Sequence, residues 1–228
     1  MGNVYLVIID GLGVGAQEDA SEYGDDGMNT LGNVSAQTNC KLPNLEQLGI
    51  GNIIPLQSVA EIKNPTAGFG KMREVSAGKD STTGHWEIAG IQLEKPFPTY
   101  PNGFPEEVLN AFCEGIGVEK VLCNKPYSGT DVIRDFGEEH IKTGWPIVYT
   151  SADSVFQVAC HEGVASIEKL YEWCDFARKS ICVDEHEVGR VIARPFTGIY
   201  PFDRVSDKRK DFSAIPPENN LKDRKSVV

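Results

Sequence analysis

The chain begins with a continuous apolar and β-branched run, and this run limits the possible folds more than any other feature. Residues Asn3–Asp10 read Asn-Val-Tyr-Leu-Val-Ile-Ile-Asp, and the glycine-rich segment Gly11–Gly15 ends the run. A strand without polar alternation is typical of a parallel sheet that helices cover on both faces. We therefore expect an α/β fold with Asp10 at the carboxyl end of a buried strand, where open α/β sheets bind ligands.

Composition excludes several classes of partner. The 228 residues carry a formal net charge of −11, from 22 Lys and Arg against 33 Asp and Glu. No basic run is present that would neutralise nucleic-acid phosphates or attach the chain to an anionic membrane. The longest apolar stretch, Val4–Ile9, is far shorter than the ~20 residues that span a bilayer. With no secretory signal visible, we expect a cytoplasmic protein whose cysteines are free thiols.

The pattern predicts further elements along the chain. We expect a polar loop over 16–40, a helix over Pro43–Leu48, and a strand near Lys71–Ser76. Closely spaced prolines just after Lys95 indicate a domain crossover, and the tail from Arg204 is predicted to be a frayed surface segment. Between them we expect helices at Pro105–Glu114, Asp131–Lys142 and Ser166–Lys179, and strands at Lys120–Cys123, Pro146–Thr150, Ser154–Cys160 and Arg190–Arg194.

The segment Gly78–Gly90 (GKDSTTGHWEIAG) carries the strongest chemical signal. Three consecutive hydroxyls, those of Ser81, Thr82 and Thr83, precede a stretch that predicts a helix. A hydroxyl at a helix N-terminus can attack a phosphoryl group whose oxygens bind the backbone N–H groups. The alternative is that these side chains only cap the helix.

Asp10 and the glycines after it allow two interpretations. Gly11, Gly13 and Ala16 fit the GxGxxA pattern of dinucleotide-binding loops, but a carboxylate just before the first glycine would face the pyrophosphate. A divalent cation suits such a carboxylate better. The alternative is a strand-ending turn with a solvated Asp10.

Two later segments contain polar clusters at predicted strands. Ser151 and Asp153 follow a strand and can bind sugar hydroxyls or form an Asx-turn. Arg190, Ile192 and Arg194 alternate along another strand and therefore share one face. Two guanidiniums on one face indicate an anion site, or else a ladder of ion pairs.

In chain order, these segments resemble the phosphopentomutase family, the manganese-dependent branch of the alkaline-phosphatase superfamily. The resemblance rests on VIIDGLGVGAQEDASEYGD, MNTLGN, GKDSTTGHWEIAG, YTSADSVFQVACHE, VGRVIARPF and the RVSDKRKDF run from Arg204, and it covers Asn3 to about Leu221. It implies an α/β fold: the N-terminal part of an alkaline-phosphatase-like parallel-sheet core over 1–96, a smaller α+β cap domain over 97–213, and a truncated return segment over 214–228.

The resemblance also implies an activity. Members interconvert (deoxy)ribose 1-phosphate and (deoxy)ribose 5-phosphate through a phosphorylated hydroxyl and a bisphosphate intermediate. The family nucleophile is normally Thr; Ser81 stands at that position here, with Thr82 as the next candidate. Asp10 and Ser81 match ligand positions for Mn²⁺, of which the complete family site holds two ions. The substrate-binding positions that the resemblance implies are Ser151, Asp153, Val155, Arg190, Ile192 and Arg204, and it implies that the two arginines clamp the 5-phosphate.

The chain departs from the family pattern after the cap. Family members return to the core and supply further Asp and His metal ligands, and we find no such motifs here. The resemblance thus implies that this chain alone is inactive as a mutase, and it makes a complementing C-terminal chain a candidate partner. The alternative function is a non-catalytic module whose cap binds pentose phosphates. A hydrolase or another mutase of the superfamily is disfavoured by the cap motifs.

Overall fold

The computed structural model describes residues 3, 5–9 and 11–217. The described residues form two compact units, of which the first ends at Arg73 and the second begins at Glu74. The second unit thus includes the 74–96 segment, which the family resemblance assigns to the core; the boundary expected between 96 and 97 stays a prediction. No helix in the described part of the chain is long and apolar enough to cross a bilayer.

The first unit is built from short helices. The expected helix over 43–48 is confirmed as α2, Pro43–Leu48, with Pro43 in its first turn and Gly49 ending it at a φ of 98°. The loop expected over 16–40 is wrong, because it contains α1, Thr30–Thr38, and a 3₁₀ helix, Ala20–Tyr23. The side chain of Asn29 caps α1 by accepting a hydrogen bond from the amide of Gly32 at 2.9 Å. A second 3₁₀ helix spans Ile50–Asn52.

Two expected strands are not formed. Within Asn3–Asp10, the described residues Asn3 and Tyr5–Ile9 are not in a strand, and no described residue of the first unit is. The physical reason is that strands need partners for their backbone groups. The strand near Lys71–Ser76 is also wrong, since the amides of Val75 and Ser76 donate to the carboxylate of Glu87 at 2.7 and 2.6 Å.

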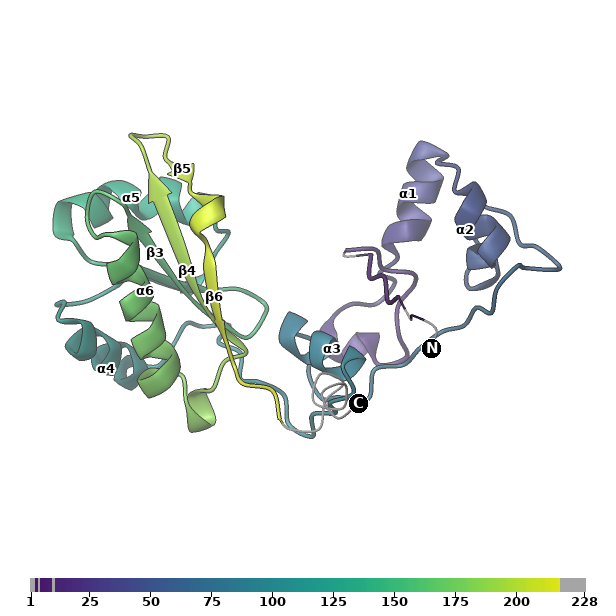
Figure 1. Ribbon diagram of the computed structural model, residues 1–228. Helices are drawn as coiled ribbons and strands as arrows, with labels where there is room; N and C mark the ends of the chain where they lie inside the picture. Colours follow the sequence, from purple (N-terminus) through teal and green to yellow (C-terminus); the bar gives the residue numbers. More distant parts are fainter. Residues whose placement is uncertain (1–2, 4, 10, 218–228) are drawn as a thin grey trace. The chain divides into compact units, whose positions relative to one another are not determined.

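The second unit is an α/β structure around a mixed sheet (Figure 1). The strand order is β1-β2-β3-β4-β5, and β6 also pairs with β4. The β1–β2 and β3–β4 pairs are parallel, whereas β2–β3, β4–β5 and β4–β6 are antiparallel. The strands are β1 Leu122–Pro126, β2 Ile147–Thr150, β3 Val155–His161, β4 Arg190–Thr197, β5 Asp203–Arg204 and β6 Lys210–Ser213.

The expected helices of this unit are confirmed. They are α4 Glu106–Ile116, α5 Asp131–Thr143 and α6 Ile167–Phe176, and α3 Ser81–Ile88 precedes them. After α6 the chain continues as a π-helix, Ala177–Ile181, and a 3₁₀ helix, Asp184–His186, comes next. Three of the four expected strands match β2, β3 and β4 closely, while β1 forms two to three residues later than expected.

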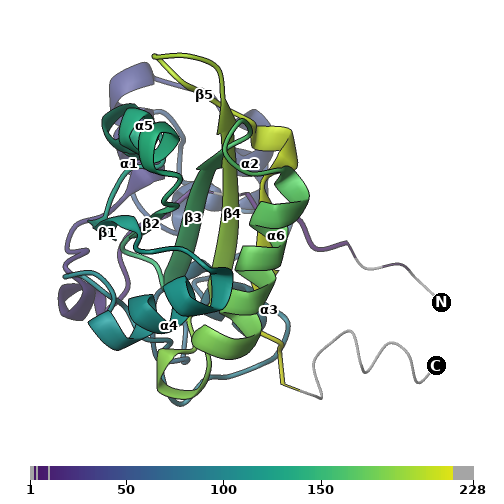
Figure 2. The same cartoon turned by 90° about the vertical axis from the view of Figure 1, so that its left-hand side faces the viewer.

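Helices cover the two faces of this sheet unequally. Phe156 and Val158 of β3 pack in one cluster with α4 and α6, whereas Ala159 packs with α5 on the opposite face (Figure 2). On β4, Phe196 belongs to the α5 face. Because side chains alternate along a strand, Arg190, Ile192 and Arg194 share that face with Phe196. The α5 face therefore carries the polar side chains of the candidate site.

The tail from Arg204 is structured where it is described, so the expectation of a frayed segment is wrong there. A 3₁₀ helix, Ser206–Lys208, leads into β6, which pairs with β4 from Arg190 opposite Ser213 to Ala193 opposite Lys210. Backbone pairing along the edge of β4 outweighs the charged composition of this segment. Residues 218–228 lie outside the described residues.

Candidate functional site

The N-terminus of α3 presents one accessible hydroxyl. Asp80 caps the helix: its Oδ1 accepts from the amides of Thr82 and Thr83 at 2.9 and 3.2 Å, and its Oδ2 accepts from Thr83 Oγ1 at 2.5 Å. The helix is thus capped, but by the carboxylate of Asp80 and not by the three hydroxyls, and these two amides are already bound to Asp80. Thr82 and Thr83 are buried, whereas Ser81 is exposed. Of the three hydroxyls, that of Ser81 is therefore the one a substrate can reach.

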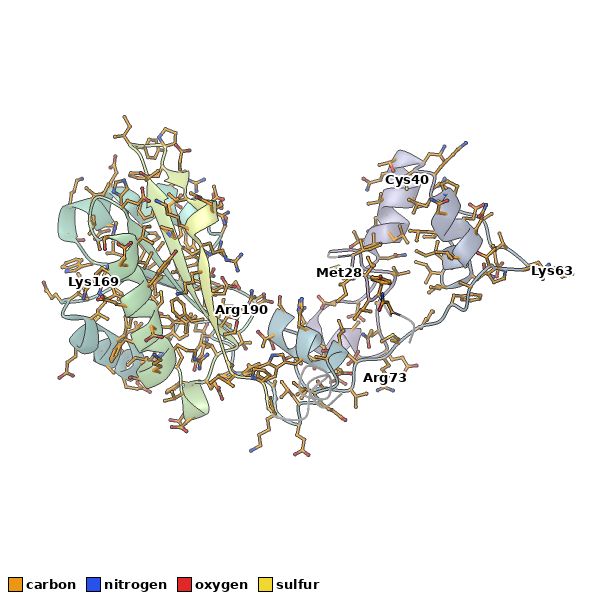
Figure 3. The ribbon with its side chains drawn as sticks, viewed as in Figure 1. Met28, Cys40, Lys63, Arg73, Lys169 and Arg190 are labelled. Atoms are coloured by element: carbon orange, nitrogen blue, oxygen red, sulfur yellow. The ribbon has the colours of Figure 1, made fainter. Side chains whose placement is uncertain are left out.

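A chain of polar contacts runs from Ser81 across the sheet. Ser81 Oγ donates to Asp153 Oδ2 at 3.4 Å, and the same oxygen pairs with Arg190 Nη2 at 3.3 Å. Arg190 Nη1 pairs with Asp211 Oδ2 at 3.2 Å, and that carboxylate also binds Arg209 Nη2 at 2.7 Å. Figure 3 labels Arg190 at the start of β4. The structure thus joins a hydroxyl, two carboxylates and two guanidiniums in one network.

A close approach at Gly189 brings the start of α3 next to the residue that precedes β4. A Cβ atom on Gly189 would lie 2.9 Å from Thr82 Oγ1 and 3.2 Å from Asp80 Oδ1. The amide of Gly189 also donates to Ser154 Oγ at 3.3 Å. Only glycine leaves room for this contact. The residue before Arg190 therefore helps to set the distance between α3 and β4.

The other predicted substrate-binding residues differ in what they can offer. Ser151 Oγ accepts from the amide of Asp153 at 3.2 Å, which holds the turn between β2 and β3. Val155 and Ile192 are each only 2% exposed, so their side chains present little surface to a ligand. Arg204, in contrast, is exposed on β5. The substrate-binding roles of these residues stay predictions.

The structure does not place Arg190 and Arg204 side by side along β4. Arg190 stands opposite Ser213, whereas Arg204 stands opposite Phe196, six positions further along the strand. At ~3.3 Å per residue these positions are about 20 Å apart along the strand. A phosphate clamp made of these two arginines would need both long side chains to reach along the sheet.

Sequence reasoning assigned no role to Gln157, Arg209 and Asp211. For Arg194 it left two roles open, an anion site and a ladder of ion pairs. Arg194 Nε donates to Gln157 Oε1 at 3.1 Å. Burial lowers the pKa of Arg194, and the nearby guanidiniums of Arg209 and Arg204 lower it further. The signal for Asp211 lay in the Arg-Lys-Asp run at 209–211, which the expectation of a frayed tail concealed.

The manganese site implied by the resemblance is not formed by the described residues alone. Asp10 lies outside them, so its predicted role as a ligand stays a prediction. Among the residues that the structure describes, no three His, Cys, Asp or Glu side chains gather where they could hold a metal ion. Ser81 with Asp153 is too small a donor set for an ion that usually takes about six oxygen ligands.

Comparisons with known proteins agree with the sequence motifs. The phosphopentomutase of Caldanaerobacter subterraneus subsp. tengcongensis is 57% identical over 213 residues, which are 93% of this chain and 54% of that protein. The phosphopentomutase of Acetivibrio thermocellus is 53% identical over 98% of this chain and 57% of its own length. That of Deinococcus radiodurans is 51% identical over 95% of this chain and 56% of its own length. No family model matches the chain.

Two facts emerge from these comparisons. The chain spans about half the length of the curated relatives it matches. The aligned part of this chain, which is 51–57% identical to these relatives, includes both the GKDSTTGHWEIAG segment and the strands of the second unit. This chain is therefore related in sequence to the phosphopentomutases over almost its whole length.

Proposed function

We propose that this chain carries the nucleophile and the sugar-phosphate-binding unit of a phosphopentomutase that interconverts (deoxy)ribose 1-phosphate and (deoxy)ribose 5-phosphate. The observation that carries the proposal is the contact of Ser81 with Asp153, which in turn pairs with Arg190. An exposed hydroxyl, a carboxylate that can accept its proton and a guanidinium that can bind phosphate oxygens are what phosphoryl transfer needs. The names of the relatives support the same reaction.

The proposed chemistry moves one phosphoryl group in each of two steps. In the first, the free hydroxyl of the pentose phosphate attacks the phosphorus on Ser81, a new O–P bond forms, and the bond from phosphorus to Ser81 Oγ breaks. Asp153 relays the proton of the attacking hydroxyl to the leaving Ser81 oxygen. In the second, Ser81 Oγ attacks the other phosphoryl group of the bisphosphate, and Asp153 relays the Ser81 proton to the leaving sugar oxygen. Arg190 offsets the phosphate charge throughout.

The test is conversion of ribose 1-phosphate to ribose 5-phosphate by this chain co-purified with the remaining part of the Caldanaerobacter relative, with Mn²⁺ and a pentose bisphosphate primer, because we expect the chain alone to be inactive. Ser81→Ala is compared with Ser180→Ala, which removes an exposed hydroxyl elsewhere in the same unit. We expect turnover to vanish only in Ser81→Ala, and phosphate label from the primer to be recovered on Ser81. Equal turnover in the two variants would contradict the role of Ser81. Binding of ribose 5-phosphate without turnover would favour the alternative, a non-catalytic module.

We also propose that the functional form contains further polypeptide that covers the N-terminal run. Side chains from Tyr5 to Ile9 are between 52% and 82% exposed, although all five are large and apolar. Such a contiguous apolar surface is typical of an interface. The occupant we propose is polypeptide equivalent to the part of the relatives' length that this chain does not span.

Co-expression tests this partner. The chain is produced together with the remaining part of the Caldanaerobacter relative, as wild type and as Leu6→Lys/Ile8→Lys. We expect the two polypeptides to co-purify and the lysine variant to separate, because burying two ammonium groups is costly. Val34→Lys, at a 40% exposed position of α1, is the control and should co-purify. Co-purification of the Leu6→Lys/Ile8→Lys variant would contradict the proposal.

A further inference from the structure

Asp211 has no role in the proposed reaction so far, although it contacts Arg190 directly. It lies on β6 opposite Ile192, and Arg190 lies on β4 opposite Ser213. Residues that stand opposite each other in a sheet point to the same face, so Asp211 and Arg190 are diagonal neighbours on the α5 face. Their contact, between Asp211 Oδ2 and Arg190 Nη1 at 3.2 Å, is therefore set by the register of the two strands.

The guanidinium of Arg190 lies between two carboxylates. Its Nη1 binds Asp211, while its Nη2 binds Asp153 Oδ2 at 3.3 Å. A guanidinium is planar, so its two terminal nitrogens form a fork of fixed geometry. With one nitrogen of the fork on Asp211, the other is directed at the carboxylate that contacts Ser81.

Asp211 is itself held in place by Arg209, which directly precedes β6. Arg209 Nε donates to Asp211 Oδ1 at 2.8 Å, and Arg209 Nη2 donates to Asp211 Oδ2 at 2.7 Å. Two such hydrogen bonds fix the orientation of a carboxylate. Asp211 therefore offers Arg190 a partner whose position is set before any substrate binds.

We infer that Asp211 is a positioning residue: it directs Arg190 toward Asp153 and acts through that arginine. The inference rests on the proposed function, in which Arg190 offsets the phosphate charge. Two effects of Asp211 compete. Its negative charge reduces the attraction of Arg190 for a phosphate, whereas its hydrogen bond holds the guanidinium in one orientation. We expect orientation to dominate, because Arg209 already pairs with Asp211 and offsets its charge.

The test is a double-mutant cycle on mutase turnover by this chain co-purified with the remaining part of the Caldanaerobacter relative. The variants are Asp211→Asn, Arg190→Met and the two together. Asparagine keeps the size of the side chain and removes its charge. Asp175→Asn is the matched control, because Asp175 of α6 also pairs with a cation, Lys179 at 2.8 Å, but on the other side of the sheet. Urea unfolding checks that each variant is folded.

We expect Asp211→Asn to lower kcat/KM about tenfold or more, since a hydrogen bond between charged groups is lost. In the Arg190→Met background the same substitution should change kcat/KM by about twofold at most, because no guanidinium is left to position. Asp175→Asn should match the wild type. A purely structural role of Asp211 would instead lower kcat/KM by the same factor in both backgrounds.

A labelling experiment on the chain itself tests the position of Arg190 without turnover. Phenylglyoxal modifies arginines, and mass spectrometry of the peptides gives the rate at each one. We expect Asp211→Asn to raise the rate at Arg190 several-fold, because one of its two carboxylate partners is removed. Arg134, which pairs with two aspartates on α5, is the internal reference and should keep its rate. An unchanged rate at Arg190 would overturn the inference, even where Arg190→Met leaves no turnover to measure.

The outcomes separate this inference from the proposed function. If Asp211→Asn is as active as the wild type or more active, orientation does not dominate and the inference fails. Equal losses in the two backgrounds also overturn it and leave the proposed function intact. A wild-type complex without turnover, or turnover that survives Ser81→Ala, rejects the proposed function and the role of Asp211 with it.

Discussion

Ser81 Oγ lies 3.4 Å from Asp153 Oδ2, although 72 positions separate these residues in the chain. The first residue begins α3, and the second lies in the turn between β2 and β3. Arg190 binds the same carboxylate oxygen from the start of β4. Three separate segments thus position the candidate nucleophile, and Gly189, just before β4, packs closely against Thr82 and Asp80 at the start of α3.

Gly189→Ala tests that packing. The added methyl would lie 2.9 Å from Thr82 Oγ1, so either α3 or the start of β4 must move. We expect the free energy of unfolding, measured in urea, to fall by about 1–3 kcal/mol. Gly84→Ala, within α3, is the control: apart from its chain neighbours and the backbone of its own helix, no described atom lies within 4 Å of the added methyl. That variant should be unchanged or more stable by up to ~1 kcal/mol. Equal stability of the two variants would show that Gly189 is not a tight contact.

His140 makes stability depend on pH. It is completely buried; its Nδ1 donates to Trp145 O at 2.7 Å, and its Nε2 accepts from the amide of His161 at 2.9 Å. These partners require the neutral ring, and burial lowers the pKa of His140 below its ordinary value of 6.5. Between the folded and unfolded pKa values the unfolded state binds more protons. The stabilising contribution of the neutral His140 ring is therefore fully present above about pH 6.5. As the pH drops below that value the contribution is lost, by at most ~1.4 kcal/mol per pH unit.

The measurement is urea unfolding at pH 7.5, 6.5 and 5.5 for the wild type, His140→Gln and His85→Gln. We expect the loss of stability on acidification to be smaller in His140→Gln than in the wild type. His85 is exposed on α3, and its variant should keep the wild-type pH profile. A His140→Gln profile parallel to that of the wild type would mean that other groups cause the pH dependence.

The cysteines should differ sharply in reactivity. All six are free thiols, as the sequence predicted. Cys113, Cys160, Cys174 and Cys182 are buried, and burial raises the pKa of both Cys160 and Cys182 to about 12. Since the thiolate is the reactive form, these four should react with a disulfide reagent at pH 8 only after unfolding. The two partly exposed thiols should react in the folded protein.

Titration with a coloured disulfide reagent, with and without guanidinium chloride, counts the thiols in each state, and mass spectrometry of the labelled peptides assigns them. Labelling confined to Cys40 and Cys123 in the folded chain would agree with the structure. Prompt labelling of Cys174, whose pKa burial raises well above the ordinary value, would contradict the packing of α6 on the sheet.

The amino-acid sequence alone predicted the elements whose cause is local. Helices α4, α5 and α6 form where apolar residues recur at helical spacing, and β2, β3 and β4 form where short apolar runs lie between turns. The same local reasoning found Ser81 at the start of a helix, and the family motifs singled out Asp153 and Arg190. These features depend on neighbours within a few positions, which a sequence displays directly.

Tertiary structure decided the features that depend on distant partners. The run from Tyr5 to Ile9 has the composition of a buried strand, yet its described residues pair with no strand, because backbone hydrogen bonds need a second segment beside them. Conversely, the charged segment Lys210–Ser213 becomes β6 because the edge of β4 offers such a partner. That pairing brings Asp211 to Arg190. The candidate site is therefore set by strand register, which no local pattern encodes.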